Sequence, residues 1–214
     1  MGRIWFDDES FLAPFGHFEK DYTFVVEYLR NPKTFGGVFF DGFDESALLQ
    51  LYVNYLKSGY GWIGFHKKKR AAYLFLELVS AHPLIYAVHG GLSRELFGRQ
   101  YGKKSMEFVK QLVFDKNNAT KLEGYILKPN NLIAGYFRRG GLVKECELKD
   151  RIYIDGNLSP ISIYGLTQKD YLDKEQHHGW QSEKARSRRD GRNTNESARK
   201  RKKKAGSRKK RKRK

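Results

Sequence analysis

Apolar and polar residues along this chain alternate with two different periods, which predicts strands and helices mixed in one domain. Short apolar runs bounded by glycine, proline or charged residues predict strands over Gly37–Phe40, Gly61–His66, Ala71–Val79, Leu84–Leu92 and Lys121–Leu127. Two or three closing strands are predicted from Leu142–Glu147, Arg151–Ile154 and Ile161–Thr167. Spacings of three and four predict helices over Phe18–Leu29, from Asp44 to Gly59, and over Gly102–Phe114 and Asn130–Arg139. The rest of residues 1–35 is rich in aromatic side chains and is expected to be irregular. Hairpins come first and a strand-helix-strand unit follows, so we expect an α/β domain.

The net charge of +18 is concentrated at the C-terminal end of the sequence. Residues 181–214, here called the basic tail, contain 18 Lys and Arg against three acidic residues, which leaves a net charge of +3 for residues 1–180. From about Ser182 the tail has no apolar residue larger than alanine, so we expect it to be disordered. Flexible polycations bind phosphate backbones by counterion release, and DNA or RNA is therefore the partner expected for residues 184–214. A solvated linker or a nuclear-import signal are the alternatives.

Length and residue types restrict the rest of the chain. A chain of 214 residues has room for one well-buried domain with an appendage. It has no long apolar segment, and the acidic residues Asp7, Asp8 and Glu9 do not fit a secretory signal, so we expect a protein of the host cytoplasm without a membrane partner. Cys146 is the only cysteine, and neither an intrachain disulfide nor a cysteine-rich metal site is expected.

One segment has the features of a phosphate-binding turn. Residues 99–105 read Arg-Gln-Tyr-Gly-Lys-Lys-Ser and lie between the strand that ends at His89-Gly90-Gly91 and an amphipathic helix. A glycine-containing turn at the start of a helix aims unpaired backbone N–H groups at one point, and the helix dipole favours an anion there. The sequence therefore makes Arg99, Gln100, Gly102, Lys103, Lys104 and Ser105 candidate phosphate-binding residues.

A second segment, Lys128-Pro129-Asn130-Asn131 followed by a helix that closes on Gly140-Gly141-Leu142, completes a recognisable order. With the turn at 99–105 and the closing Ile163-Tyr164-Gly165-Leu166-Thr167, it resembles the GNAT superfamily of N-acetyltransferases. The resemblance covers roughly residues 60–170. It implies a GNAT-like, mixed and mostly antiparallel central sheet flanked by helices, with residues 1–59 as the substrate-side part of the domain, 60–170 as the acyl-CoA-binding core and 171–214 as the disordered tail.

The resemblance also implies an activity and site residues. Acetyl-CoA would be the co-substrate of an acyl transfer to an unidentified amine, with Asn130 at the family's helix asparagine. Lys104 stands where the family has a small residue. Many members carry a tyrosine that protonates the departing thiolate, and that position is Phe137 here. The adjacent Tyr136 is a candidate, although one residue along a helix turns a side chain by about 100°.

His89 is the main acid/base candidate, because the resemblance places it on the central strand facing the thioester and imidazole titrates near neutral pH. A structural histidine at the strand end is the alternative. Glu77 on the preceding strand is a weaker candidate base.

A second reading of function stays open. The compact body, the strand end His89-Gly90-Gly91 and the closing Tyr164-Gly165-Leu166-Thr167 also resemble acetyltransferase-like proteins of tailed bacteriophages. The altered Lys104 and Phe137 would suit a catalytically weakened GNAT-fold binding or virion-associated protein that holds nucleic acid through its tail. The intact order of elements and His89 favour the enzyme.

Overall fold

The computed structural model describes residues 2–16, 18–30, 50, 60–97, 100–126, 130–154 and 157–173. It divides the chain into two units, Met1–Lys169 and Asp170–Lys214, and the sheet and helices below belong to the first. Three sequence predictions lie outside the described residues: the strand at Gly37–Phe40, the helix that starts near Asp44, and the basic tail.

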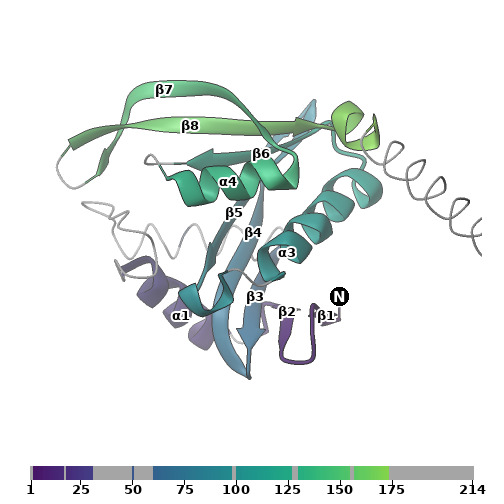
Figure 1. The fold of residues 1–214 in the computed structure, drawn as a ribbon, viewed down its shortest axis with the longest axis vertical. Helices are drawn as coiled ribbons and strands as arrows, with labels where there is room; N and C mark the ends of the chain where they lie inside the picture. The colour runs from purple at the N-terminus through teal and green to yellow at the C-terminus, as the bar shows by residue number, and fades with distance from the viewer. Residues whose placement is uncertain are drawn as a thin grey trace, which may run out of the picture. The chain divides into compact units, whose positions relative to one another are not determined.

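The first unit is built on one eight-stranded sheet with the order β1-β2-β3-β4-β5-β6-β8-β7 (Figure 1). The strands are β1 Ile4–Trp5, β2 Ser10–Pro14, β3 Gly61–His66, β4 Lys69–Ala81, β5 Leu84–Leu92, β6 Lys121–Ile126, β7 Val143–Ile154 and β8 Asn157–Thr167. All neighbouring strands pair antiparallel except β5 and β6, which are parallel. A parallel pair needs a crossover connection, and here the crossover contains α3.

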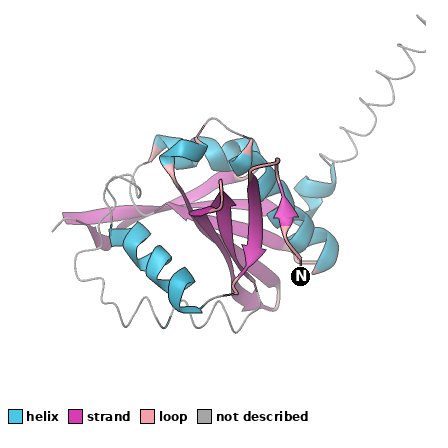
Figure 2. Ribbon diagram, turned by 90° about the horizontal axis from the view of Figure 1, so that it is seen from below, coloured by secondary structure: helices cyan, strands magenta, loops and turns pink. Residues whose placement is uncertain are grey.

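Helices cover both faces of this sheet (Figure 2). They are α1 Phe18–Arg30, α3 Tyr101–Lys110 and α4 Asn131–Gly140, with a short 3-10 turn η1 Arg94–Leu96 and a π-helical extension η2 Gln111–Lys116 after α3. Side-chain packing identifies the face that each helix covers. A Cβ added at Gly91 would meet Tyr28 of α1, whereas one at Gly124 would meet Phe137 of α4. Strand side chains alternate between faces, so these two contacts assign every position of β5 and β6 to a face.

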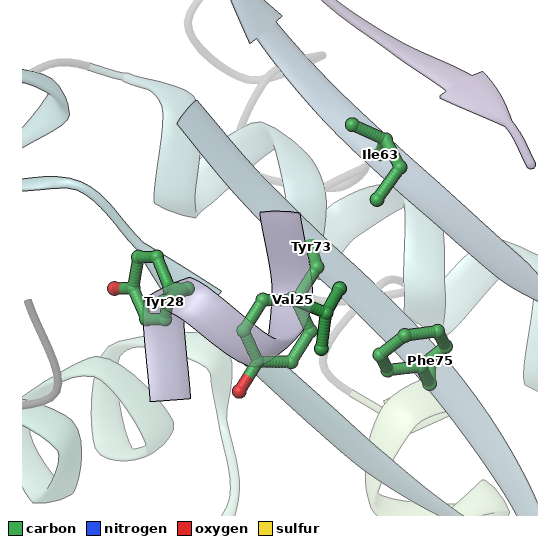
Figure 3. Packing of buried hydrophobic residues seen from close by; sticks show 5 residues of the cluster. All are labelled: Val25, Tyr28, Ile63, Tyr73 and Phe75. Carbon is green, nitrogen blue, oxygen red and sulfur yellow. The ribbon is translucent and has the colours of Figure 1, made fainter. Parts of the chain in front are cut away.

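The α1 face has an aromatic core, shown in Figure 3. Val25 and Tyr28 of α1 pack against Ile63 of β3 and against Tyr73 and Phe75 of β4. The rings of Tyr28 and Tyr73 meet edge to face with centroids 5.4 Å apart. Such contacts add about 0.5–1.5 kcal/mol to the free energy gained by burying the rings. This cluster therefore fixes α1 on the first half of the sheet.

The opposite face is filled by side chains of α3 and α4. Trp62 of β3 is 1% exposed and meets Phe108 edge to face at 5.1 Å. Phe137 of α4 packs beside Tyr164 of β8 at 5.6 Å. Gly140, the last residue of α4, approaches Met106 of α3 closely enough that a Cβ there would lie 2.7 Å from the methionine Cγ. The two helices thus pack against each other as well as against the sheet.

Most predicted elements are confirmed. The strands predicted at Gly61–His66 and Leu84–Leu92 have the same first and last residues in the structure. The three predicted helices that correspond to α1, to α3 with η2, and to α4 agree within a few residues, and so does the strand that corresponds to β6. One prediction was wrong, since Ser10–Pro14 is a strand rather than irregular. Of the two or three closing strands that the sequence allowed, the structure has two, because the segments 142–147 and 151–154 belong to one long strand, β7, with register shifts.

None of the described helices is both long enough and apolar enough to cross a membrane.

Candidate active site

The parallel strands β5 and β6 separate near the middle of the sheet. Their ladder runs from the pair Ile85 and Lys121 to the pair Val88 and Gly124. Beyond that pair β5 continues to Leu92 alongside β4, and β6 continues to Ile126 alongside β8. The sheet therefore opens between β5 and β6 after Val88 and Gly124, and we call this place the opening.

Gly90 gives the opening a backbone that a ligand can approach. This glycine is exposed, and a Cβ there would lie 3.0 Å from the Tyr73 carbonyl oxygen. Its neighbour Gly91 is required for a different reason, since Tyr28 and Tyr73 occupy the space of its missing side chain. Glycine within a strand commonly marks a place where another backbone or a ligand comes close.

The start of α3 has the features of an anion site. Its N-cap residue, Gln100, makes no side-chain cap hydrogen bond, and its first turn contains no acidic residue. The first N–H groups of a helix have no partner within it and carry the positive end of the helix dipole. Lys103 is exposed in the same turn. Arg99 lies outside the described residues.

Gly102 and Tyr136 are in direct contact. A Cβ at Gly102 would lie 3.1 Å from Cε2 of Tyr136, so the tyrosine ring of α4 lies against the first turn of α3. Burial raises the pKa of Tyr136 above its ordinary value, and the nearby Glu107 adds to the effect. Tyr136 is thus protonated at neutral pH, and it faces the α3 start.

Lys104 and Ser105 both use their side chains for hydrogen bonds within the protein. The Lys104 ammonium donates a hydrogen bond to the Phe6 carbonyl oxygen in the turn between β1 and β2. Phe6 itself packs edge to face on Tyr101 at 4.7 Å, so this turn packs on the start of α3. Ser105 is buried, and its hydroxyl donates to the Tyr101 carbonyl oxygen at 2.9 Å.

Asn130 and Phe137 both have structural contacts in α4. The Asn130 side chain accepts hydrogen bonds from the N–H groups of Leu132 at 3.1 Å and Ile133 at 3.2 Å, which caps the helix. Phe137 is 5% exposed and its ring fills the space beside Gly124. An apolar ring therefore covers, on the α4 face, the last residue of β6 that pairs with β5.

His89 lies on the α1 face, one residue past the last pair of the ladder. Its Nε2 is 2.8 Å from Oε2 of Glu77 on β4. This hydrogen bond lowers the pKa of Glu77, outweighing the opposing effect of its partial burial. Both side chains are partly exposed, at 31% for His89 and 45% for Glu77. The sequence candidates His89 and Glu77 are thus brought together.

Tyr125 stands opposite His89 across the opening. The two ring centroids are 6.1 Å apart. The Tyr125 hydroxyl donates a 2.7 Å hydrogen bond to Oε2 of Glu123, two residues earlier on the same face of β6. Lys121 in turn lies 2.9 Å from Oε1 of Glu123. We call Glu77, His89, Glu123 and Tyr125 the polar cluster.

Ionisation in the polar cluster is set by these contacts. Burial raises the pKa of Tyr125, and its hydrogen bond to the Glu123 carboxylate raises it further. Burial opposes the charge on Glu123, yet the hydrogen bonds from Tyr125 and Lys121 lower its pKa overall. At neutral pH the polar cluster therefore contains two ionised carboxylates, Glu77 on β4 and Glu123 on β6, and the neutral phenol of Tyr125.

Tyr125 and Glu123 were not among the residues selected from the sequence. The signal that identifies them is the alternation in β6, which places Lys121, Glu123 and Tyr125 on one face and Leu122, Gly124 and Ile126 on the other. Three polar residues on one face, next to His89, would have marked this face as a site. Among the described residues, no three His, Cys, Asp or Glu side chains come close enough together to hold a metal ion.

The fold of this chain is similar to that of several solved structures, although no family profile and no curated protein matches the sequence. A GNAT-family acetyltransferase from Bacillus anthracis has 12% sequence identity, with a TM-score of 0.58 over 78% of this chain and 99% of the other. The ribosomal-protein-S5-alanine acetyltransferase from Vibrio fischeri has 16% identity, with a TM-score of 0.62 over 78% of this chain and 97% of the other. The chain has a GNAT-like fold.

A third structure with this fold contains its ligands. The spermidine N-acetyltransferase from Vibrio cholerae, solved in complex with CoA and spermine, has 14% identity and a TM-score of 0.61 over 78% of this chain and 99% of the other. The similarity extends over nearly the whole length of each of these three proteins. The predicted fold class, a mixed and mostly antiparallel sheet flanked by helices, is confirmed.

Proposed function

We propose that this protein is an acyl-CoA-dependent N-acyltransferase that transfers an acetyl group from acetyl-CoA to an amine. The opening between β5 and β6, followed directly along the chain by the uncapped start of α3, is the observation that carries the proposal. The CoA complex of a protein with the same fold supports it.

The opening suits the pantetheine arm of CoA. Backbone N–H and C=O groups need hydrogen-bond partners, and the β5–β6 ladder supplies none past the pair Val88 and Gly124. Pantetheine contains two amides in an extended chain, so it can pair with β5 as an added strand would. Gly90 permits the close approach that this requires.

The start of α3 suits the pyrophosphate. Its free N–H groups, its dipole and the exposed Lys103 all favour an anion, and Gln100 leaves the helix start uncapped. Lys104, which bonds the Phe6 carbonyl, does not crowd this position. His89, held by Glu77, is the group that accepts the proton of the attacking amine.

Calorimetric titration with CoA and acetyl-CoA at low salt tests binding. We expect the full-length protein to bind both, and the substitution Gly102→Val to weaken binding at least about tenfold by blocking the helix start. Gly16→Val is the matched control, because a Cβ at this glycine before α1 has only the Pro14 carbonyl oxygen nearby, at 3.9 Å. The melting temperature of each variant shows whether Gly102→Val acts through the Tyr136 contact instead.

Release of the CoA thiol tests transfer. Spermidine and peptides with a free N-terminal alanine are suitable first acceptors, and turnover with either establishes the activity. Absence of heat and of a thermal shift at millimolar CoA would refute the proposal. Binding of CoA without turnover for any acceptor would favour the second reading, a GNAT-fold protein without catalysis, such as a virion-associated one.

The basic tail supports a second function, nucleic-acid binding. Its 34 residues contain 18 Lys and Arg and three acidic residues, so the tail carries +15 of the net charge of +18. Such a charge density attracts polyphosphates whatever their base sequence. This proposal rests on composition and is independent of the acyltransferase.

A further inference from the structure

Acyl transfer from a thioester requires a proton donor for the sulfur that leaves. When an amine displaces a thiol from a thioester, sulfur departs as a thiolate and needs a proton. General acids that supply such protons contribute about 10²–10⁴-fold to rates. The inference that follows rests on the proposed function and concerns which residue supplies that proton.

On the α4 face, the phenol beside the last β5–β6 pair belongs to Tyr164, which pairs with Gly124 from β8 and is 5% exposed. There the ring of Phe137 fills the space beside Gly124 and packs on Tyr164. Phenylalanine has no proton to give. Tyr136, the neighbouring residue, lies against Gly102 at the start of α3.

The α1 face offers a phenol at the same position. Tyr125 directly follows Gly124, the last residue of β6 that pairs with β5, and its side chain points to the α1 face. It lies across from His89, with ring centroids 6.1 Å apart. We propose that Tyr125 is the proton donor to the departing thiolate, and that Glu123 holds its hydroxyl in place until the thiolate forms.

Tyr125 carries its proton when the thiolate forms. Burial and the carboxylates of Glu123 and Glu77 raise its pKa, so the phenol keeps its proton at neutral pH. An ordinary cysteine thiol has a pKa near 8.5, below that of the phenol, so the proton transfer is unfavourable by itself and is drawn forward by formation of the amide. Glu123 is ionised and accepts the hydrogen bond, which fixes the direction of the O–H until rotation about the Cζ–O bond turns it to the sulfur.

His89 and Tyr125 then each carry out one of the two proton transfers. The amine nitrogen forms a bond to the thioester carbon and gives one proton to His89, while the carbon–sulfur bond breaks and its electron pair leaves with sulfur. Tyr125 gives its proton to that sulfur, which yields the free CoA thiol. The resulting phenolate takes a proton from water and His89 returns its proton to water, so amine and thioester become amide and thiol with no net change.

The substitution Tyr125→Phe tests the assignment, since it removes the hydroxyl and keeps the ring. We expect kcat to fall by about 10²–10⁴-fold with acetyl-CoA, with CoA affinity by calorimetry unchanged. Tyr164→Phe is the matched control on the neighbouring strand, because its ring packs with Phe137 on the α4 face, and it should keep normal kcat.

The acetyl ester of seleno-CoA separates a proton donor from a structural residue. A selenol is far more acidic than a thiol, so the selenolate leaves without a proton. We expect the defect of Tyr125→Phe to shrink to less than about tenfold with this substrate. The defect of His89→Ala should persist, because His89 acts on the amine and not on the leaving group.

Each outcome decides between the two proposals. Equal kcat for wild type and Tyr125→Phe with acetyl-CoA overturns the role of Tyr125 and leaves the acyltransferase intact. An equal defect of Tyr125→Phe with both esters also overturns it, because it shows a structural effect. A wild-type protein that binds CoA but transfers to no acceptor overturns the acyltransferase, and the Tyr125 role falls with it.

Discussion

At the scale of single residues, the pair of Asp21 and Arg70 joins α1 to the sheet. The Asp21 side chain is 3% exposed, and its Oδ1 is 2.8 Å from both Nε and Nη2 of Arg70 at the start of β4. The Gly16 N–H donates to its other oxygen at 3.3 Å. Removing one partner of a buried pair leaves an uncompensated charge, which costs far more than the pair contributes.

We therefore expect Asp21→Asn to lower the free energy of unfolding by about 3 kcal/mol, at the low end for buried pairs because Arg70 stays partly exposed. For a domain of this size that corresponds to a melting temperature lower by roughly 6–12 °C. Differential scanning calorimetry measures it. Asp8→Asn, at an exposed position, is the control, and an equal loss in both variants would contradict the role of the buried pair.

Residue contacts also show where sequence reasoning about the site ended. His89 and Gly102 were selected because motif spacing and strand pattern place them in the second half of β5 and at the start of α3, and the structure has both elements there. The bond from Lys104 to Phe6, 98 positions away in sequence, depends on how the β1–β2 turn lies on α3, and no local pattern encodes that. The same holds for the contact of Tyr136 with Gly102, which depends on the packing of two helices.

At the scale of elements, the turn between β3 and β4 has an unusual backbone. Lys67 and Lys68 have φ values of 48° and 66°, in the left-handed region. A two-residue hairpin turn requires this conformation at both positions, and asparagine and glycine normally supply it. A lysine there is strained by about 1–2 kcal/mol.

Lys68→Gly should accordingly stabilise the protein by about 1 kcal/mol, because glycine adopts a positive φ without steric cost. Urea denaturation monitored by circular dichroism would show a higher midpoint. In Lys69→Gly the same residue replaces the first lysine of β4, where the backbone is extended and glycine adds only conformational entropy to the unfolded chain, so its midpoint should fall. A lower midpoint for Lys68→Gly would mean that the turn is not strained.

Strands could be predicted from the sequence where burial imposes a clear pattern of apolar and polar residues. In β6 the alternation of polar and apolar residues is complete, and in β5 a continuous apolar run ends in two glycines, so both strands could be located from the sequence. β2 was missed because its five residues include Pro14 and sit among aromatic residues without alternation. The number of closing strands stayed open because residues 143–151 of β7 are all exposed, so burial imposes no period on them.

At the scale of the whole molecule, charge is divided between two parts of the chain. Residues 1–180 carry a net +3, and the basic tail carries the remainder of the +18. We expect the full-length protein to bind unrelated DNA duplexes with equal affinity, and that affinity to fall by about 10³–10⁵ between 50 and 200 mM salt if six to ten phosphates are contacted.

Fluorescence anisotropy of full-length protein and of residues 1–175 on two duplexes provides the measurement. Truncation should remove nearly all binding, because little net charge remains. Equal binding by residues 1–175 would place the nucleic-acid site in the folded part of the chain, and a strong preference for one duplex would exclude a simple polycation.

The two edge strands of the sheet, β1 and β7, influence whether copies of this protein aggregate at high concentration. A long, flat, apolar strand at the edge of a sheet invites pairing with another chain, and natural sheets avoid it with short strands, charges and bulges. One edge here is β1, with two residues. The other is β7, where Lys144, Glu147 and Lys149 are exposed, the register shifts twice, and Asp150 has a φ of 49°. Strand-by-strand growth into fibrils is thereby disfavoured at both edges, and any self-association of this protein should use the faces of its sheet or its helices.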